Sequence, residues 1–167
     1  MMTMANAGQS ETLHEATKVL AAMASVLEHE AVAISLVSTE SQADPQQTLA
    51  IQAMNVSTLS TLTAKTLGLS QEEIKHVGMG GLFHNVGMSR IPQAVYLKRE
   101  EEMSPTETKL LRTYPQLGKE ILGAIPGVAP EIIEIVCQHR EWLDGTGYPK
   151  RLTNGDIAKS ARLVGTE

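Results

Sequence analysis

Wherever the apolar residues of this chain recur regularly, they do so at helical intervals. Near the N-terminus the intervals are three, four or seven residues, as at Leu13, Leu20, Met23, Leu27 and Ile34. Such intervals line one face of an amphipathic helix. No segment of useful length alternates apolar and polar residues as a half-buried strand does. The pattern therefore predicts an all-α fold.

Capping residues, prolines and glycines divide the first half of the chain into helices. Asp44-Pro45 has the pattern of an N-cap followed by a first-turn proline, and Gly68 ends the helix that this pair opens. The segment from Ser70 to Glu73 is a capping box, which starts a helix that ends near His84. Three glycines inside this second helix are poor helix formers and predict either close packing or a kink. They are Gly78, Gly80 and Gly81.

The second half of the chain carries similar signals. The segment from Ser104 to Glu107 is another capping box, and Tyr114-Pro115 breaks the helix that it starts. Pro130 opens a helix that leads to His139. After a glycine-rich loop, the segment 154–156 is expected to cap a final helix that runs to the chain end.

Charge and cysteine content limit the function classes. The formal net charge is −5 without a basic cluster, which argues against nucleic acid or an anionic membrane as the main partner. No run approaches the roughly 18 apolar residues of a membrane span. Cys137 is the only cysteine, so an internal disulfide framework is excluded and a cytoplasmic location fits best. We expect a tail, a helix and a linker at 1–44, and one domain at 45–167.

Four ordered segments carry recognisable motifs: His84 to Pro92, Tyr114 to Leu122, His139 to Pro149, and Ala161 to Leu163. Together they resemble the HD-GYP branch of the HD superfamily, and the D-G-T-G-Y-P loop is the most specific match. The resemblance implies an HD-type bundle of about seven helices. It also implies relatives that hydrolyse cyclic di-GMP with two or three metal ions. Relative to that family, the C-terminal part of the chain is expected to be truncated.

Several metal-binding positions of that family are substituted in this chain. The resemblance implies ligands at an H-D pair, at the histidine of an H-P motif, at both histidines of H-H-E, and at a later aspartate without a certain match here. His84 is kept, but the aspartate beside it is Asn85, which brings no negative charge to hold two cations together. Tyr114 replaces the H-P histidine, and Met88 replaces a lysine expected to contact substrate phosphate. Arg140 replaces the second H-H histidine and cannot lose a proton to bind a metal.

Of the expected inner ligands, only His84 and His139 remain. Two imidazoles make a weak site, because stable zinc sites usually have three or four protein ligands. We therefore expect no resident cofactor, and a divalent metal, if bound, would be iron, manganese or zinc at this pair. The leading hypothesis is a catalytically degenerate HD-GYP domain that works as a signalling or protein-interaction module. Two alternatives stay open. One is a metal-dependent phosphodiesterase or phosphohydrolase with a reduced site, and the other is a non-hydrolysing cyclic dinucleotide receptor that uses Arg90, Lys119 and Arg140.

The loop itself supports two interpretations. In the first it is structural: its glycines make the turn, Asp144 caps it and Tyr148 packs. In the second it is a recognition surface, as the resemblance to domains that dock diguanylate cyclase (GGDEF) partners implies. The residues concerned are Glu141, Trp142, Asp144, Gly145, Gly147, Tyr148 and Pro149. Arg140 is expected either to pair with Glu141 or to hold the phosphate of an anionic ligand. A homodimer through the early helices is also left open.

Overall fold

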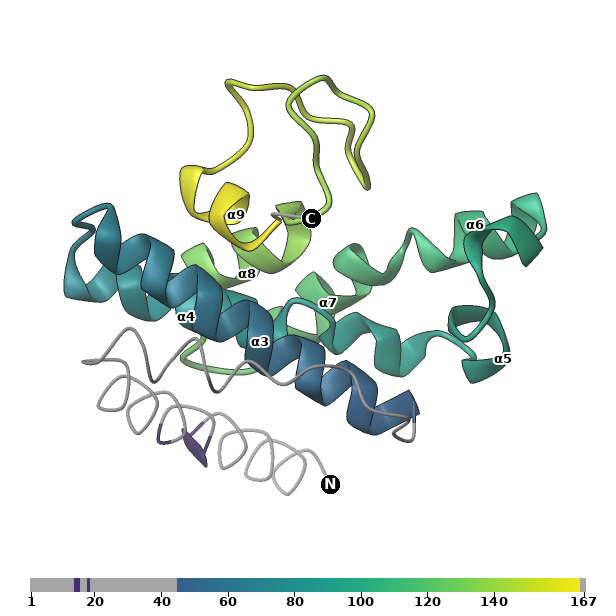
Figure 1. Ribbon diagram of the computed structural model, residues 1–167, viewed down its shortest axis with the longest axis horizontal. Coiled ribbons are helices and arrows are strands. Elements are labelled where there is room, and N and C mark those ends of the chain that lie inside the picture. Colours follow the sequence, from purple (N-terminus) through teal and green to yellow (C-terminus); the bar gives the residue numbers. More distant parts are fainter. Residues whose placement is uncertain (1–13, 16–17, 19–44, 166–167) are drawn as a thin grey trace.

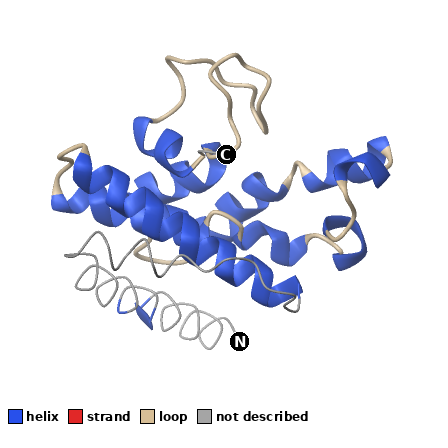
Figure 2. Ribbon diagram, viewed as in Figure 1, coloured by secondary structure: helices blue, strands red, loops and turns tan. Residues whose placement is uncertain are grey.

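The described part of the chain is built from helices and connecting loops (Figure 2). The computed structural model describes residues 14–15, 18 and 45–165. Within these ranges, the β-type pairing is limited to one isolated bridge between Asp144 and Thr153. The predicted all-α fold is therefore confirmed. No helix within these ranges has both the length and the apolar character that crossing a membrane requires. The helix and the linker predicted within 1–44 fall outside the described residues, apart from positions 14–15 and 18.

Two long helices, α3 (Pro45–Thr66) and α4 (Gln71–Phe83), lie side by side along the molecule (Figure 1). After α3 the backbone turns at Gly68, which has a φ of 73°. The Ser70 hydroxyl then accepts a hydrogen bond from the Glu73 backbone N–H, and the Glu73 carboxylate accepts one from the Ser70 N–H. Such a reciprocal cap stabilises a helix start by about 1 kcal/mol. The predicted end of the first helix at Gly68 and the predicted start of the second at Ser70 are both correct.

The glycines of α4 allow its neighbours to approach closely. A Cβ atom on Gly81 would come within 2.8 Å of the Ser57 Cα on α3. A Cβ atom on Gly80 would come within 2.9 Å of the Ile135 Cβ on α8 (Pro130–Gln138). Helix α4 runs unbroken from Gln71 to Phe83, and close packing accounts for the glycines at positions 80 and 81.

The core joins four helices that are distant in sequence. Ala64 on α3, Val77 on α4, Ile135 on α8 and Val164 on α9 (Lys159–Val164) form one buried cluster. Each fully buried Val or Ile side chain contributes roughly 1.5–3 kcal/mol to folding. A second buried cluster joins α4, α7 (Tyr114–Gly123) and α8, and its members are Met79, Leu122, Ile132 and Val136. These contacts fix the C-terminal ends of α4 and α8 relative to each other.

Between α4 and α7 the chain forms four short helical segments. They are the 3-10 helix η1 (Val86–Arg90), α5 (Gln93–Tyr96), the 3-10 helix η2 (Glu100–Glu102) and α6 (Pro105–Leu111). The segments α5 and α6 form one end of the molecule (Figure 1). The capping box at Ser104 and Glu107 starts α6 as predicted. The segments η1, α5 and η2 were not predicted, because three to five residues are too few to establish a period.

The start of the last helix differs from the sequence-based expectation. Residues 154–156 form a turn, in which the Asp156 N–H donates to the Thr153 carbonyl at 2.9 Å. Helix α9 begins only after Ala158, whose N–H donates to the Gln138 side chain on α8 at 2.7 Å. The predicted cap at 154–156 is therefore wrong, because a contact with α8 determines where this helix begins. The expectation of about seven helices is confirmed, since α3 to α9 lie in the described part of the chain.

Candidate functional site

Two helix ends bring His84 and His139 together. His84 is the C-cap of α4, and His139 is the C-cap of α8. Their ring centroids are 5.2 Å apart, with an angle of 79° between the ring planes. The packing of α4 against α8 thus places in one location the two histidines that sequence reasoning had singled out.

Hydrogen bonds to the backbone fix the tautomers of both rings. The Nδ1 atom of His84 lies 2.7 Å from the Gly81 carbonyl oxygen, and the Nδ1 atom of His139 lies 2.8 Å from the Val136 carbonyl oxygen. A carbonyl oxygen only accepts, so each Nδ1 carries a proton. In the neutral ring, the lone pair is then on Nε2, which is the atom that would bind a metal ion.

The lone pair of His139 already accepts a hydrogen bond. The Tyr114 hydroxyl lies 2.8 Å from Nε2 of His139. Because that nitrogen carries no proton in the neutral ring, the hydroxyl is the donor. Tyr114 and His139 are 5% and 4% exposed, so the bond is buried. Tyr114, which stands where the family has a ligand histidine, therefore hydrogen-bonds to Nε2 of His139, the atom that would bind a metal ion.

The environment of His139 favours its neutral form. Burial lowers its pKa most, the charges of His84 and Arg140 lower it further, and the Val136 carbonyl opposes them. The resulting pKa is about 3. The imidazole is thus neutral at physiological pH and retains the lone pair that Tyr114 uses.

Asn85 and Met88 both make structural contacts. The Asn85 side-chain NH₂ donates to the Leu49 carbonyl on α3 at 2.8 Å. An ionised aspartate has no proton to donate there. Met88 packs against the buried cluster of Ile91, Val95 and Tyr114. Asn85 lacks the negative charge of the aspartate that the family has at its position, and Met88 lacks the positive charge of the lysine.

Arg140 faces a tyrosine of the glycine-rich loop. Its Nε donates to the Tyr148 hydroxyl at 2.9 Å, and its guanidinium carbon lies 5.6 Å from the centroid of the Tyr148 ring. The neighbouring Glu141 carboxylate accepts from two backbone N–H groups across the loop, those of Lys150 at 2.6 Å and Leu152 at 2.8 Å. Glu141 therefore holds the two sides of the loop together.

The rest of the loop is held by local contacts. Asp144 accepts hydrogen bonds from both the backbone N–H and the hydroxyl of Thr146. A Cβ atom on Gly147 would lie 2.5 Å from the Arg140 carbonyl oxygen, so this position requires glycine. Gly145 has a φ of 78°, and the Tyr148-Pro149 peptide bond is cis.

The two aromatic residues of the loop differ in exposure. Tyr148 is half-buried and packs beside Tyr114, with ring centroids 6.4 Å apart. Trp142 and Leu143 are 52% and 55% exposed. Of these two aromatic side chains, Trp142 alone is largely exposed to solvent.

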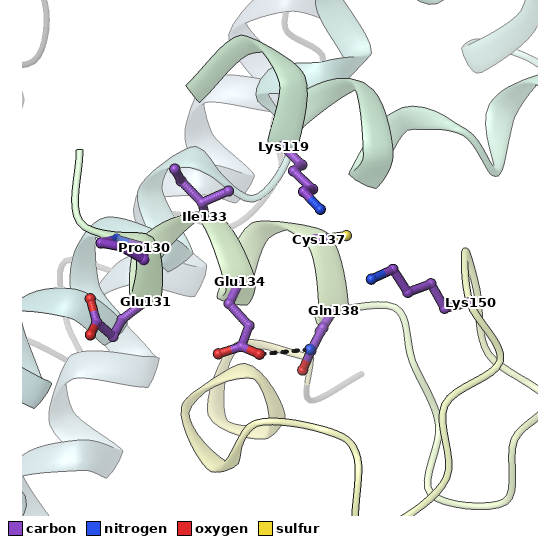
Figure 3. Close-up of a pocket in the computed structure, with 8 residues that line it drawn as sticks. All are labelled: Lys119, Pro130, Glu131, Ile133, Glu134, Cys137, Gln138 and Lys150. Atoms are coloured by element: carbon purple, nitrogen blue, oxygen red, sulfur yellow. Dashed lines mark hydrogen bonds between the residues drawn. The ribbon is translucent and has the colours of Figure 1, made fainter. Parts of the chain in front are cut away.

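The three cations expected to hold a ligand's phosphate lie in different surroundings. Arg90 pairs with Glu120 at 3.4 Å on the surface. Lys119 lines a cavity of about 420 Å³, into which Lys150 also points beside Cys137 (Figure 3). Arg140 lines a different cavity, next to the loop.

Sequence reasoning missed two cations beside Arg140. Lys98 and Arg112 line the same cavity. These residues lie on short or irregular segments without a recognisable motif, and no sequence signal links them to Arg140.

The side chains at this site do not fit a centre of two metal ions. Such a centre needs anionic oxygens that bridge the cations, as well as imidazoles. Here the amide nitrogen of Asn85 is bonded to Leu49, and Nε2 of His139 accepts from Tyr114. Within the described ranges, no three or more His, Cys, Asp or Glu side chains form a group that could hold a metal ion.

Comparison with known proteins identifies the family. The HD domain family matches residues 31–166. A cyclic di-GMP phosphodiesterase of Pseudomonas aeruginosa is 29% identical over 95% of this chain and 38% of its own length. The cyclic di-GMP phosphodiesterase response regulator RpfG of Xanthomonas campestris is 31% identical over 65% of this chain and 29% of its own length.

A solved structure gives the same result. An HDG"Y"P protein from Bdellovibrio bacteriovorus matches with a TM-score of 0.73 and 25% identity, over 90% of this chain and 47% of that one. The chain thus spans less than half the length of these relatives. It belongs to the HD domain family, in its HD-GYP branch.

Proposed function

We propose that this chain is a degenerate HD-GYP domain that regulates or binds signalling components without hydrolysing cyclic di-GMP. The observation that carries the proposal is the buried hydrogen bond from the Tyr114 hydroxyl to Nε2 of His139. A metal ion at His139 would have to displace this hydroxyl from the only ring nitrogen able to ligate. Phosphodiester hydrolysis in this family depends on metal-held hydroxide, and this bond opposes metal binding.

The other substituted positions support the same proposal. Asn85 bonds to Leu49, Met88 packs in a core cluster, and Arg140 bonds to Tyr148. Each replacement thus makes a contact with another residue of this chain. Such contacts are what we expect of a domain in which a metal no longer organises the site.

We further propose that the domain works with a cyclic dinucleotide and a protein partner. The names of the relatives include cyclic di-GMP, which makes this nucleotide the first ligand to test. Trp142 and Leu143 project from the loop, and a large exposed aromatic beside an aliphatic side chain suits the centre of an interface. A diguanylate cyclase (GGDEF) domain is the first partner to test.

Protein purified without chelator is expected to contain substoichiometric iron, manganese and zinc and to leave cyclic di-GMP intact. Metal content is measured by mass spectrometry, and turnover by chromatography of the nucleotide after incubation with added manganese. Stoichiometric metal together with steady hydrolysis would contradict the proposal.

A restored variant provides the positive control for this assay. The triple change Asn85→Asp, Tyr114→His and Arg140→His returns a carboxylate and two imidazoles beside the histidine pair. It is expected to retain more metal than the native chain under the same purification, since each change replaces a poor donor with a good one. Equal metal content in both proteins would mean that these three positions do not limit metal binding.

A further inference from the structure

We propose that a cleft beside α8 binds a short free peptide, whose terminal carboxylate meets two lysines and whose terminal ammonium group meets a glutamate. We call it the α8 cleft: a cavity of about 420 Å³ whose lining includes Lys119, Glu131, Ile133, Cys137 and Lys150 (Figure 3). Neither residue of the histidine pair lines it, so the inference does not rest on the proposed function.

Two lysines give one end of the α8 cleft a positive charge. Lys119 reaches this end from α7 and Lys150 from the segment after the glycine-rich loop, and both side chains point towards Cys137 (Figure 3). Burial raises the pKa of the Cys137 thiol, and the charges of Lys150 and Lys119 act against that rise, so both ammonium groups lie near one atom. In the part of the chain that the structure describes, neither ammonium group forms an ion pair with a carboxylate. Two such cations at one point favour an anionic group of a ligand.

Glu131 gives the opposite end of the α8 cleft a negative charge, and it lies away from Lys150 in Figure 3. It belongs to the first turn of α8, and Cys137 lies six residues later on the same helix. At a rise of about 1.5 Å per residue, these two positions are about 9 Å apart along the helix axis. Glu134, which lies between them, accepts a hydrogen bond from the Gln138 side-chain amide at 3.0 Å. Among the described residues Glu131 has no ion-pair partner, so its carboxylate can pair with a cationic group of a ligand.

The distance between the two charged ends matches a peptide of about three residues. An extended chain spans about 3.3–3.6 Å per residue, so about three residues span about 10 Å, close to the separation along α8. A free peptide carries an ammonium group at one end and a carboxylate at the other, in the order that the charges of the cleft require. An internal segment of a protein carries neither terminal charge, so this arrangement selects a free peptide.

The size and the apolar part of the α8 cleft suit the same ligand. Its volume of about 420 Å³ lies within the roughly 300–1,000 Å³ that small-molecule sites occupy. Pro130 and Ile133 add apolar surface to the lining, against which an aliphatic side chain of the peptide can pack. A tripeptide with an apolar middle residue is therefore the first ligand to test.

Calorimetric titration of the full chain with the tripeptide Ala-Leu-Ala is expected to show saturable binding at millimolar concentration. N-acetylation of this peptide removes its ammonium group, and C-amidation removes its carboxylate. Each modified peptide is expected to bind about tenfold more weakly, since a hydrogen bond to a charged group usually contributes that much to affinity. These comparisons use the native chain, so their outcome does not depend on the folding of a variant.

Two variants assign each end of the peptide to its partner. Lys150→Met is expected to weaken Ala-Leu-Ala binding by about tenfold and to leave the affinity for the C-amidated peptide unchanged. Glu131→Gln is expected to act in the same way on Ala-Leu-Ala and to leave the affinity for the N-acetylated peptide unchanged. The 2.6 Å hydrogen bond to Glu141 comes from the Lys150 backbone N–H, so the methionine variant retains it.

Lys75→Met and Glu72→Gln are the matched controls. Lys75 is exposed, as Lys150 is. Glu72 lies in the first turn of α4, as Glu131 lies in that of α8, so both glutamine variants lose the same kind of interaction with a helix dipole. Neither control residue lines the α8 cleft, and both controls are expected to bind Ala-Leu-Ala as the native chain does. No saturable heat at millimolar peptide, equal affinity for the modified peptides, or equal losses in the controls would each overturn the inference.

Cys137 reports where the peptide lies, because it is the only cysteine in the chain and lines the α8 cleft. Saturating Ala-Leu-Ala is expected to slow the reaction of this thiol with methyl methanethiosulfonate, which mass spectrometry measures. The N-acetylated peptide at the same concentration is expected to protect the thiol less. Saturable binding with an unchanged reaction rate would place the peptide elsewhere on the chain and overturn the inference.

Discussion

Replacing Gly87 with alanine is expected to destabilise this protein by about 3 kcal/mol or more. Gly87 is buried in η1, against the first turn of α7. A Cβ atom there would overlap the Tyr114 carbonyl oxygen and come within 2.7 Å of the Gly118 backbone nitrogen. Because both neighbours are backbone atoms, the clash is relieved only if η1 and α7 separate. Urea unfolding followed by circular dichroism measures the loss.

Gly123→Ala is the matched control for this change. Gly123 ends α7, and a Cβ atom there would meet nothing within 4 Å. The substitution is expected to leave stability unchanged or raise it by up to about 1 kcal/mol, because alanine restricts the unfolded chain and favours helix. If Gly87→Ala unfolded at the same urea concentration as the control, the close approach of η1 to α7 would be wrong.

The same change is expected to affect the candidate site. Tyr114 begins α7, and its hydroxyl reaches His139. When η1 pushes α7 away, this hydroxyl moves with the helix. Gly87, which has no side chain, thus helps to position the hydrogen bond between Tyr114 and His139 on which the proposed function depends.

Helix boundaries were predicted well where the signal is local. Ser70 and Ser104 each bond to a glutamate three residues later, and Pro130 opens its helix as expected. These interactions depend on a few neighbouring residues, so the sequence alone contains them. The start of α9 was predicted wrongly because it depends on Gln138, which lies 20 residues away from Ala158.

The candidate site was predictable in part. The order of the motifs singled out His84 and His139, and the fold brings them to a centroid distance of 5.2 Å. No sequence pattern could reveal that the Tyr114 hydroxyl reaches Nε2 of His139, since this depends on how α7 packs against α8. Lys98 and Arg112 beside Arg140 were missed for a similar reason, because packing alone brings these cations to one cavity.

Mild acid is expected to lower the free energy of unfolding by about 2 kcal/mol between pH 6.5 and about pH 5. Burial lowers the pKa of His139 from its ordinary 6.5 to about 3. Below pH 6.5 the unfolded chain binds a proton at this residue while the folded protein does not. Stability is therefore complete above pH 6.5 and falls by about 1.4 kcal/mol per pH unit towards the folded pKa. Urea unfolding at a series of pH values measures the slope.

This pH window separates the histidine from the carboxylates. Glu73, Glu107 and Asp144 have pKa values lowered from ordinary values of 4.5, 4.5 and 3.8, so their stabilisation is lost only in stronger acid. In His139→Asn, an amide N–H replaces the Nδ1 donor to the Val136 carbonyl, and no group titrates at this position. This variant is expected to be less stable at neutral pH and to show little slope between pH 6.5 and about pH 5. A native slope that persists in the variant would mean that the acid response comes from another residue. Loss of the slope in the variant would show that the acid response comes from the neutral ring of His139, which accepts a hydrogen bond from Tyr114.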